Sequence, residues 1–283
     1  MSNLADVSAK DCDAMLELVC READPTVELQ MPERKRRLAD GLAALIDADV
    51  WMWSATAVNH DVPGDTMTTH MINDGWQSEE ERILVYEKLT SSDFAGERML
   101  PLYHAMRSSS HTTSLGDELF TPSEWETISK LWSVTGFRSF ILSFHPVSLN
   151  ASSNIGMHRR RAKPDFGERE KTIVHLVMSR VGWMHRHGIY EAAHEQVIRL
   201  SPRERQVLML MLNGQGRKAI AAGLGISEHT VGDYQKKLHK HFNVSSRAEL
   251  QAYFFLGGQA QSLEGAASAD PSSEEASSED DAA

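Results

Sequence analysis

The segment from residue 200 to residue 256 constrains the fold most strongly, because its pattern predicts four short helices joined by tight turns. Apolar residues recur there at helical spacing. Ser201 precedes Pro202 and has Glu204 three positions later, a pattern typical of a helix N-terminus with a capping box. Glycines from Gly214 onward then end this first helix.

The next part of the segment predicts two helices joined by a tight turn. A short helix is expected over 218–223, followed by a turn at 224–226 that contains Gly225. Ser227 then caps a third helix that we expect to reach Phe242. A loop over 243–246 and a fourth helix over 247–256 complete the segment.

The third helix has one apolar face and one polar, mostly basic face. Val231, Leu238 and Phe242 are spaced i, i+7 and i+11, so they share a buried stripe. A bundle with a solvated basic face would show the same pattern. The charge distribution favours a second interpretation, because residues 199–256 hold nine Lys/Arg and four Asp/Glu, a net +5, in a chain of net charge −11. Two helices around a glycine turn, with local positive charge, indicate a helix-turn-helix that binds phosphates.

The same segment resembles the LuxR/NarL-type helix-turn-helix family. The resemblance covers about a fifth of the chain and rests on residues in the family's order and spacing: Leu200, Ser201, Pro202, Arg203, Glu204, Arg205, Leu208, Gly214, Ile220, Ala221, Leu224, Ile226, Ser227, Thr230, Val231, Ser246 and Arg247. It implies a transcription regulator that is not an enzyme and that binds double-stranded DNA. It also implies a homodimer joined through 247–256. RNA polymerase is a separate candidate partner, on which the helical domain would dock if it were a pure protein-interaction module.

Residues on and after the third helix are the expected DNA contacts: Thr230, Val231, Gly232, Asp233, Lys236, Lys237, Lys240 and Arg247. The family's common lysine is replaced by Gly232, which offers no side chain. Asp233 suits the N4 amino group of cytosine, and Lys236 suits O6 and N7 of guanine. These departures put the family's usual operator sequence in doubt, but not DNA binding.

The first 198 residues predict an α+β domain. Amphipathic helices are expected near both ends, over 7–20, 29–47 and 165–187. Helices over 79–89 and from Pro122 lie between two strand pairs, at 50–59 with 66–76 and at 138–147 with 154–161. The stretch 91–121 has no clear pattern. This order resembles a GAF-like sensor domain, with a PAS-like domain as the alternative.

We therefore expect three parts: a GAF/PAS-like sensor domain with an N-terminal helix over 1–198, a helix-turn-helix domain over 199–257, and a disordered tail over 258–283. Residues 259–283 hold seven acids and no base, and such a segment has little apolar surface to bury. The fold class is thus an α+β sensor followed by an all-α four-helix domain. The sensor's signal is unidentified, and a small-molecule ligand is one candidate.

Composition narrows the classes of protein to which the chain can belong. Two cysteines and no long apolar run predict a cytoplasmic protein with no membrane partner. His175, His185, His187 and His194 match no standard metal-site spacing, so we expect solvated histidines, no metal and no cofactor. Five tryptophans are expected to pack in the core rather than line a small-molecule pocket: Trp51, Trp53, Trp76, Trp125 and Trp132. The rival hypotheses are a protein-interaction module and an enzyme in the first domain, for which no catalytic set is visible.

Overall fold

A computed structural model describes residues 6–26, 28–59, 61–89, 100–187, 197, 199–212 and 214–255. Within these residues, five strands form one antiparallel sheet in the order β2-β1-β5-β4-β3. The strands are β1 (Val50–Val58), β2 (Thr66–Asp74), β3 (Thr112–Leu115), β4 (Phe137–Ser148) and β5 (Ala151–Arg160). The α+β prediction for the first domain is therefore confirmed, and so are both predicted strand pairs.

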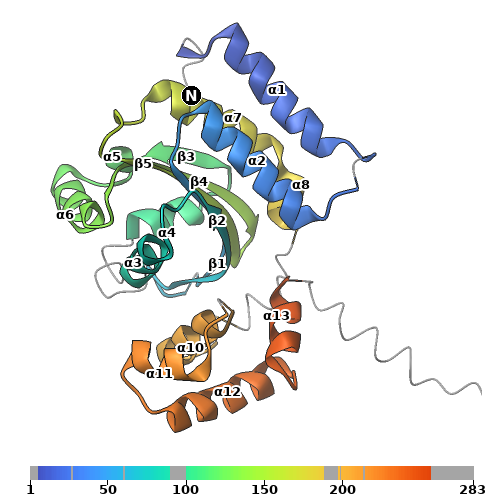
Figure 1. Cartoon of the computed structure of the whole chain (residues 1–283), viewed down its shortest axis with the longest axis vertical. Helices are drawn as coiled ribbons and strands as arrows, with labels where there is room; N and C mark the ends of the chain where they lie inside the picture. The colour runs from blue at the N-terminus through green and yellow to red at the C-terminus, as the bar shows by residue number, and fades with distance from the viewer. Residues whose placement is uncertain are drawn as a thin grey trace, which may run out of the picture.

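One face of the sheet is covered by helices from both ends of the domain, namely α1 (Ala9–Ala23), α2 (Met31–Leu45), α7 (Glu168–Arg180) and α8 (Gly182–Arg186) (Figure 1). Strand alternation turns Trp51 and Trp53 toward this layer. Both indole rings are buried there, as predicted for core packing, among side chains of α2 and α7.

The opposite face of the sheet is covered by helices from the middle of the domain: α3 (Glu79–Leu89), α4 (Leu100–Met106), α5 (Gly116–Leu119) and α6 (Pro122–Ser133) (Figure 1). The start of α6 follows the sequence closely, because Thr121 caps it and forms a capping box with Glu124. The stretch 91–121, which the sequence left unassigned, contributes α4, β3 and α5 among its described residues.

The expectation of one continuous helix over 165–187 is wrong. Helix α7 ends at Arg180, Val181 leaves helical geometry at φ −99° and ψ 38°, and α8 begins at Gly182. The break redirects the chain so that the side chain of His185 is fully buried against the sheet. The expectation that His185 is solvated is therefore also wrong.

The last described segment forms the four predicted helices, α10 (Pro202–Leu212), α11 (Arg217–Leu224), α12 (Glu228–Phe242) and α13 (Arg247–Phe255). Gly225 ends α11 in the left-handed conformation at φ 62°, which glycine adopts without strain. The predicted tail over 258–283 lies outside the described residues. Among the described helices, none is long and apolar enough to cross a membrane.

The helical domain docks on the edge strand of the sheet through α10 and α13 (Figure 1). Ala57 and Met67, on β1 and β2, belong to the same buried cluster as the core of the four helices. Arg205 of α10 forms an ion pair with Asp65, in the turn before β2. Apolar packing and a half-buried ion pair therefore join the two parts of the chain.

Candidate functional site

Helix α12 is fixed in place by its two ends and by its apolar stripe. The Ser227 side chain accepts a hydrogen bond from the backbone N–H of Thr230, at 3.0 Å, and so caps the N-terminus. At the other end, Asn243 adopts the left-handed conformation that closes the helix. Val231, Leu238 and Phe242 are buried in the core, as predicted. The opposite face of the helix therefore points outward.

The outward face of α12 carries Asp233, Lys236, Lys237 and Lys240, spaced i, i+3, i+4 and i+7. All four side chains are exposed, with 82% of the Lys236 side chain and 51% of the Asp233 side chain accessible. Helix α12 lies on the side of the helical domain away from the sheet (Figure 1). These four predicted contacts are thus together on one open surface, which we call the basic face.

Asp233 is not isolated on the basic face. Its carboxylate lies 3.8 Å from Lys236 Nζ and 3.6 Å from His229 Nε2. Exposed pairs of this kind contribute roughly 0–1 kcal/mol, so an approaching phosphate or base can displace them at small cost. Asp233 therefore partly neutralises the lysine next to it until such a group arrives.

The structure gives the other predicted contact residues different surroundings. The Val231 side chain is 0% exposed and supports the core, while Gly232 is also buried. Thr230 is partly exposed at the first turn of α12, where its backbone N–H meets the Ser227 cap. Arg247 donates to the carbonyls of Met211 (2.9 Å) and Gln215 (3.0 Å), so its guanidinium holds the C-terminal end of α10.

Arg217 is a candidate contact that the sequence analysis missed. It begins α11, is exposed, and donates from Nε to Gln235 Oε1 of α12 at 3.2 Å. Its guanidinium carbon lies 3.7 Å from the position a Cβ would take at Gly232. A positive group from the neighbouring helix thus lies in van der Waals contact with the place where a side chain at position 232 would begin. The Arg217-Lys218 pair directly after Gly216 was the signal in the sequence.

The segment 247–256, which the resemblance implied would join two copies, buries its described large apolar side chains within the chain itself. Leu250, Tyr253 and Phe254 are at most 8% exposed and pack in the core of the helical domain, with Tyr253 and Phe254 against Phe242. Leu256 lies outside the described residues. In this arrangement, the three described side chains stabilise the fold of one copy.

A second candidate site is a partly open cavity of about 500 Å³ between the sheet, helices α3, α4 and α6, and the N-terminal half of α10. Most of its lining is apolar, with methionine, leucine and phenylalanine side chains. The lining extends to Arg205, Gln206 and Met209 of α10. A molecule in this cavity could therefore contact both the first domain and α10, the helix that begins the helical domain.

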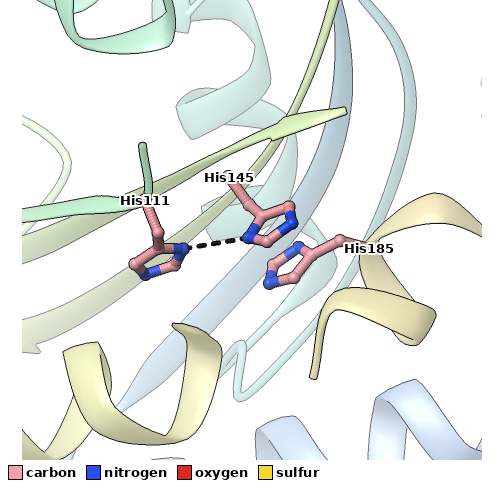
Figure 2. A group of neighbouring side chains, drawn as sticks. All are labelled: His111, His145 and His185. Atoms are coloured by element: carbon pink, nitrogen blue, oxygen red, sulfur yellow. Dashed lines mark hydrogen bonds between the residues drawn. The ribbon is translucent and has the colours of Figure 1, made fainter. Parts of the chain in front are cut away.

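Histidines gather on the other face of the sheet, where Figure 2 shows His111, His145 and His185 side by side. Nδ1 of His111 lies 3.2 Å from Nδ1 of His145. His185 donates from Nε2 to the carbonyl of Met178 at 3.0 Å, which leaves its Nδ1 to accept from the Ser153 hydroxyl at 2.8 Å. Sequence spacing could not reveal this cluster, because its members come from three distant segments.

The cluster does not present three nitrogens to one metal ion. Two imidazoles on a tetrahedral zinc would place their nitrogens about 3.3 Å apart, which the pair His111 and His145 matches. However, the rings of His145 and His185 are stacked, with centroids 4.2 Å apart and planes 4° from parallel. Lone pairs in parallel rings point along parallel planes and do not converge. Burial lowers the pKa of His111 to about 3 and that of His185 well below its usual value, so both rings are neutral at pH 7. Neutral imidazole is the form that binds metals, so only the stacked ring geometry opposes a shared ion.

Comparison with known proteins places the helical domain in a family. Residues 199–254 match the model of bacterial regulatory proteins of the luxR family. A helix-turn-helix-type transcriptional regulator from the exeN 3′ region of Aeromonas salmonicida is 50% identical over 52 residues, which cover 18% of this chain and 26% of the relative. FixJ, a transcriptional regulatory protein of Azorhizobium caulinodans, is 35% identical over 103 residues, 34% of this chain and 49% of its own length.

The chain thus spans half or less of the length of these relatives. Escherichia coli SdiA aligns with 88% of this chain and 98% of its own, at 15% identity and a TM-score of 0.35. SdiA in complex with octanoyl-rac-glycerol covers 87% and 95%, at 15% identity and a TM-score of 0.41. Such scores are too low to establish a common fold. The chain carries a luxR-family helix-turn-helix domain over 199–254.

Proposed function

We propose that the chain is a sequence-specific transcription regulator that binds double-stranded DNA through the basic face of α12. The observation that carries the proposal is the luxR-family helical domain, which presents Lys236, Lys237 and Lys240 on one exposed surface. Helix α12 is the second helix of the helix-turn-helix, the one that enters the major groove. Arg217 adds a positive group beside it, where Gly232 has no side chain.

The remaining parts of the proposal concern the signal and the partners. The first domain is a GAF-like or PAS-like sensor, and its cavity of about 500 Å³ receives a small-molecule ligand. Two copies bind DNA as a homodimer, since each copy reads one half-site. RNA polymerase is a further candidate partner. Because the proposed regulator binds genomic DNA, we propose that it acts in the cytoplasm.

DNA binding is tested by the salt dependence of affinity. We expect the full chain to bind duplex DNA with an affinity that falls steeply with salt, because bound lysine and arginine side chains release counterions. Replacing Arg217 with alanine should reduce the magnitude of the log–log slope by about 0.9, the value for one phosphate contact. Fluorescence anisotropy with labelled duplexes from about 50 to 200 mM salt gives both quantities.

Arg138→Ala is the matched control, because this exposed arginine lies on β4, outside the helical domain. It should leave the slope unchanged. An unchanged slope for Arg217→Ala would remove Arg217 from the interface. A full chain with no measurable DNA affinity would contradict the proposal and favour a module that docks on another protein.

A further inference from the structure

Lysine side chains on the basic face of α12 have few acidic partners among the described residues. Lys236 Nζ lies 3.8 Å from the Asp233 carboxylate, while neither Lys237 nor Lys240 forms an ion pair with a described residue. The Lys237 ammonium lies instead 5.7 Å from the centroid of the Tyr234 ring. Lys236 and Lys240 are about 6 Å apart along the helix axis, so three like charges crowd one surface. An anion that binds between them relieves their repulsion.

The segment that follows α13 in the sequence supplies such an anion. Residues 259–283 hold seven acids and no base, and six of the seven lie between Asp270 and Asp281. Residues 1–198 hold 29 Asp/Glu against 20 Lys/Arg, so the first domain repels this segment on balance. Residues 199–256, in contrast, have a net charge of +5. Charge complementarity therefore favours the helical domain, and within it the exposed lysines of the basic face.

The acidic segment is attached close to α12. The rings of Phe254 and Phe242, in the last turns of α13 and α12, have centroids 5.1 Å apart, and Lys240 lies in the same last turn of α12. Glu275 follows Phe255 by 20 positions. A random coil of that length has a root-mean-square end-to-end distance of about 25 Å, whereas the 15 residues of α12 span about 22 Å. The segment is therefore long enough to reach every lysine of the basic face.

Attachment to the same chain strengthens a contact that would be weak between separate molecules. A flexible connection of such a length gives an effective concentration in the millimolar range. Acidic groups that bind the lysines with an intrinsic dissociation constant of about 1 mM would then cover the basic face most of the time. DNA binds only the uncovered fraction, so its apparent dissociation constant rises by the corresponding factor.

We propose that the acidic segment over 264–281 binds the basic face of α12 and competes with DNA for Lys236, Lys237 and Lys240. The inference rests on the proposed function, because DNA is the competing anion. Carboxylates of the segment occupy the positions that phosphates take when DNA is bound, which holds the regulator in a state of lower DNA affinity. Because the contact joins exposed charges, it weakens as the salt concentration rises.

Neutralising the segment in the full chain tests the competition. The neutralised variant replaces four acids with the corresponding amides: Glu274→Gln, Glu275→Gln, Glu279→Gln and Asp280→Asn. We expect this variant to bind duplex DNA roughly threefold or more tightly than wild type at about 50 mM salt. At about 200 mM salt the gain should fall below about 1.5-fold, because screening already weakens the contact in wild type. Fluorescence anisotropy measures both affinities.

The matched control removes four exposed acids from the first domain: Asp13→Asn, Glu17→Gln, Glu28→Gln and Glu80→Gln. It changes the net charge of the chain by the same amount, so it should alter DNA affinity by less than about 1.5-fold at either salt concentration. Equal gains in the two variants would show a general charge effect and would overturn the binding of the segment to α12.

A carbodiimide tests the contact directly, because it joins a carboxylate to an ammonium group without a spacer. After digestion of the full chain, mass spectrometry should find residues 264–281 linked to the three lysines of the basic face, and excess duplex DNA should suppress these links. Lys10 and Lys130, which are exposed in the first domain, serve as internal controls. Links that reach these two lysines equally often, or that persist with DNA, would overturn the proposal.

The outcomes separate this inference from the proposed function. Equal DNA affinities of wild type and the neutralised variant at about 50 mM salt would overturn the competition and leave DNA binding through α12 intact. Absence of DNA affinity in both proteins would overturn the competition together with the proposed function. DNA affinity that only the neutralised variant shows would support both.

Discussion

Replacing both Lys236 and Lys240 with glutamate lowers the affinity of the full chain for duplex DNA by roughly a hundredfold near 0.1 M salt, if each lysine meets a phosphate or a base. Both side chains are exposed on the same face of α12, one helical turn apart. Each lost contact removes about one decade of affinity at this salt concentration, and the new carboxylates add repulsion. Fluorescence anisotropy on one duplex measures the change.

The control for this charge reversal keeps the net charge equal. Lys10 and Lys130 are exposed lysines on α1 and α6. The double variant Lys10→Glu, Lys130→Glu therefore changes the net charge of the chain by the same amount, but outside the helical domain. This control should lose less than about threefold in affinity, since the Debye length near 0.1 M salt is about 10 Å. Equal losses in both double variants would show that α12 is not the DNA-binding surface.

Acidification from pH 7 to pH 5 destabilises the folded chain by about 4 kcal/mol or more, because several histidines are kept neutral by burial. Burial lowers the pKa of His158 and of His111 to about 3, and that of His70 to about 4. For His158, which is 3% exposed, the change in the free energy of unfolding is about 2 kcal/mol over this interval. His70 and His111 are less buried and contribute less each.

The direction of the pH effect follows from proton binding. Between pH 6.5 and the lowered pKa of about 3, the unfolded chain binds protons that the folded chain does not, so stability falls as the pH falls. Above pH 6.5 these histidines are mostly neutral in both the folded and the unfolded chain, so they no longer reduce the free energy of unfolding. Carboxylates lose their contribution to stability at lower pH than the histidines do. The ion pair with Arg169 lowers the pKa of Asp11 to about 2, so the stability that this carboxylate contributes is lost only as the pH falls below about 3.8.

Urea unfolding at pH 7, 6 and 5 measures this effect and assigns it. His158→Phe should remove about 2 kcal/mol of the loss between pH 7 and 5, because that ring no longer takes up a proton on unfolding. Asp11→Asn should leave the loss in this window unchanged, since its carboxyl titrates lower. A stability that is constant from pH 7 to pH 5 would contradict the burial of neutral histidines.

The elements that the sequence predicted well are those specified by neighbours along the chain. Ser227 marks the start of α12 because its side chain bonds the N–H of Thr230, three residues later. Thr121 marks α6 in the same way. The left-handed turn at Gly225 follows from the lack of a side chain. Local caps and apolar periodicity thus determined most of the helices.

The features that the sequence did not predict depend on contacts between distant segments. His111, His145 and His185 meet only because β4, the start of β3 and α8 pack together. Arg217 reaches the position beside Gly232 only once α11 lies across α12. The short strand β3 has four residues and is specified by its pairing with β4 rather than by its own pattern.

Selection from random duplex DNA with the full chain tests the central claim of sequence-specific binding through α12. We expect wild type to enrich a common sequence, and Lys236→Ala to enrich one that differs at a single position in each half-site, because one good base contact discriminates by roughly 1–3 kcal/mol. If the full chain enriches no sequence, or if both proteins enrich the same one, base reading through Lys236 on this helix is contradicted.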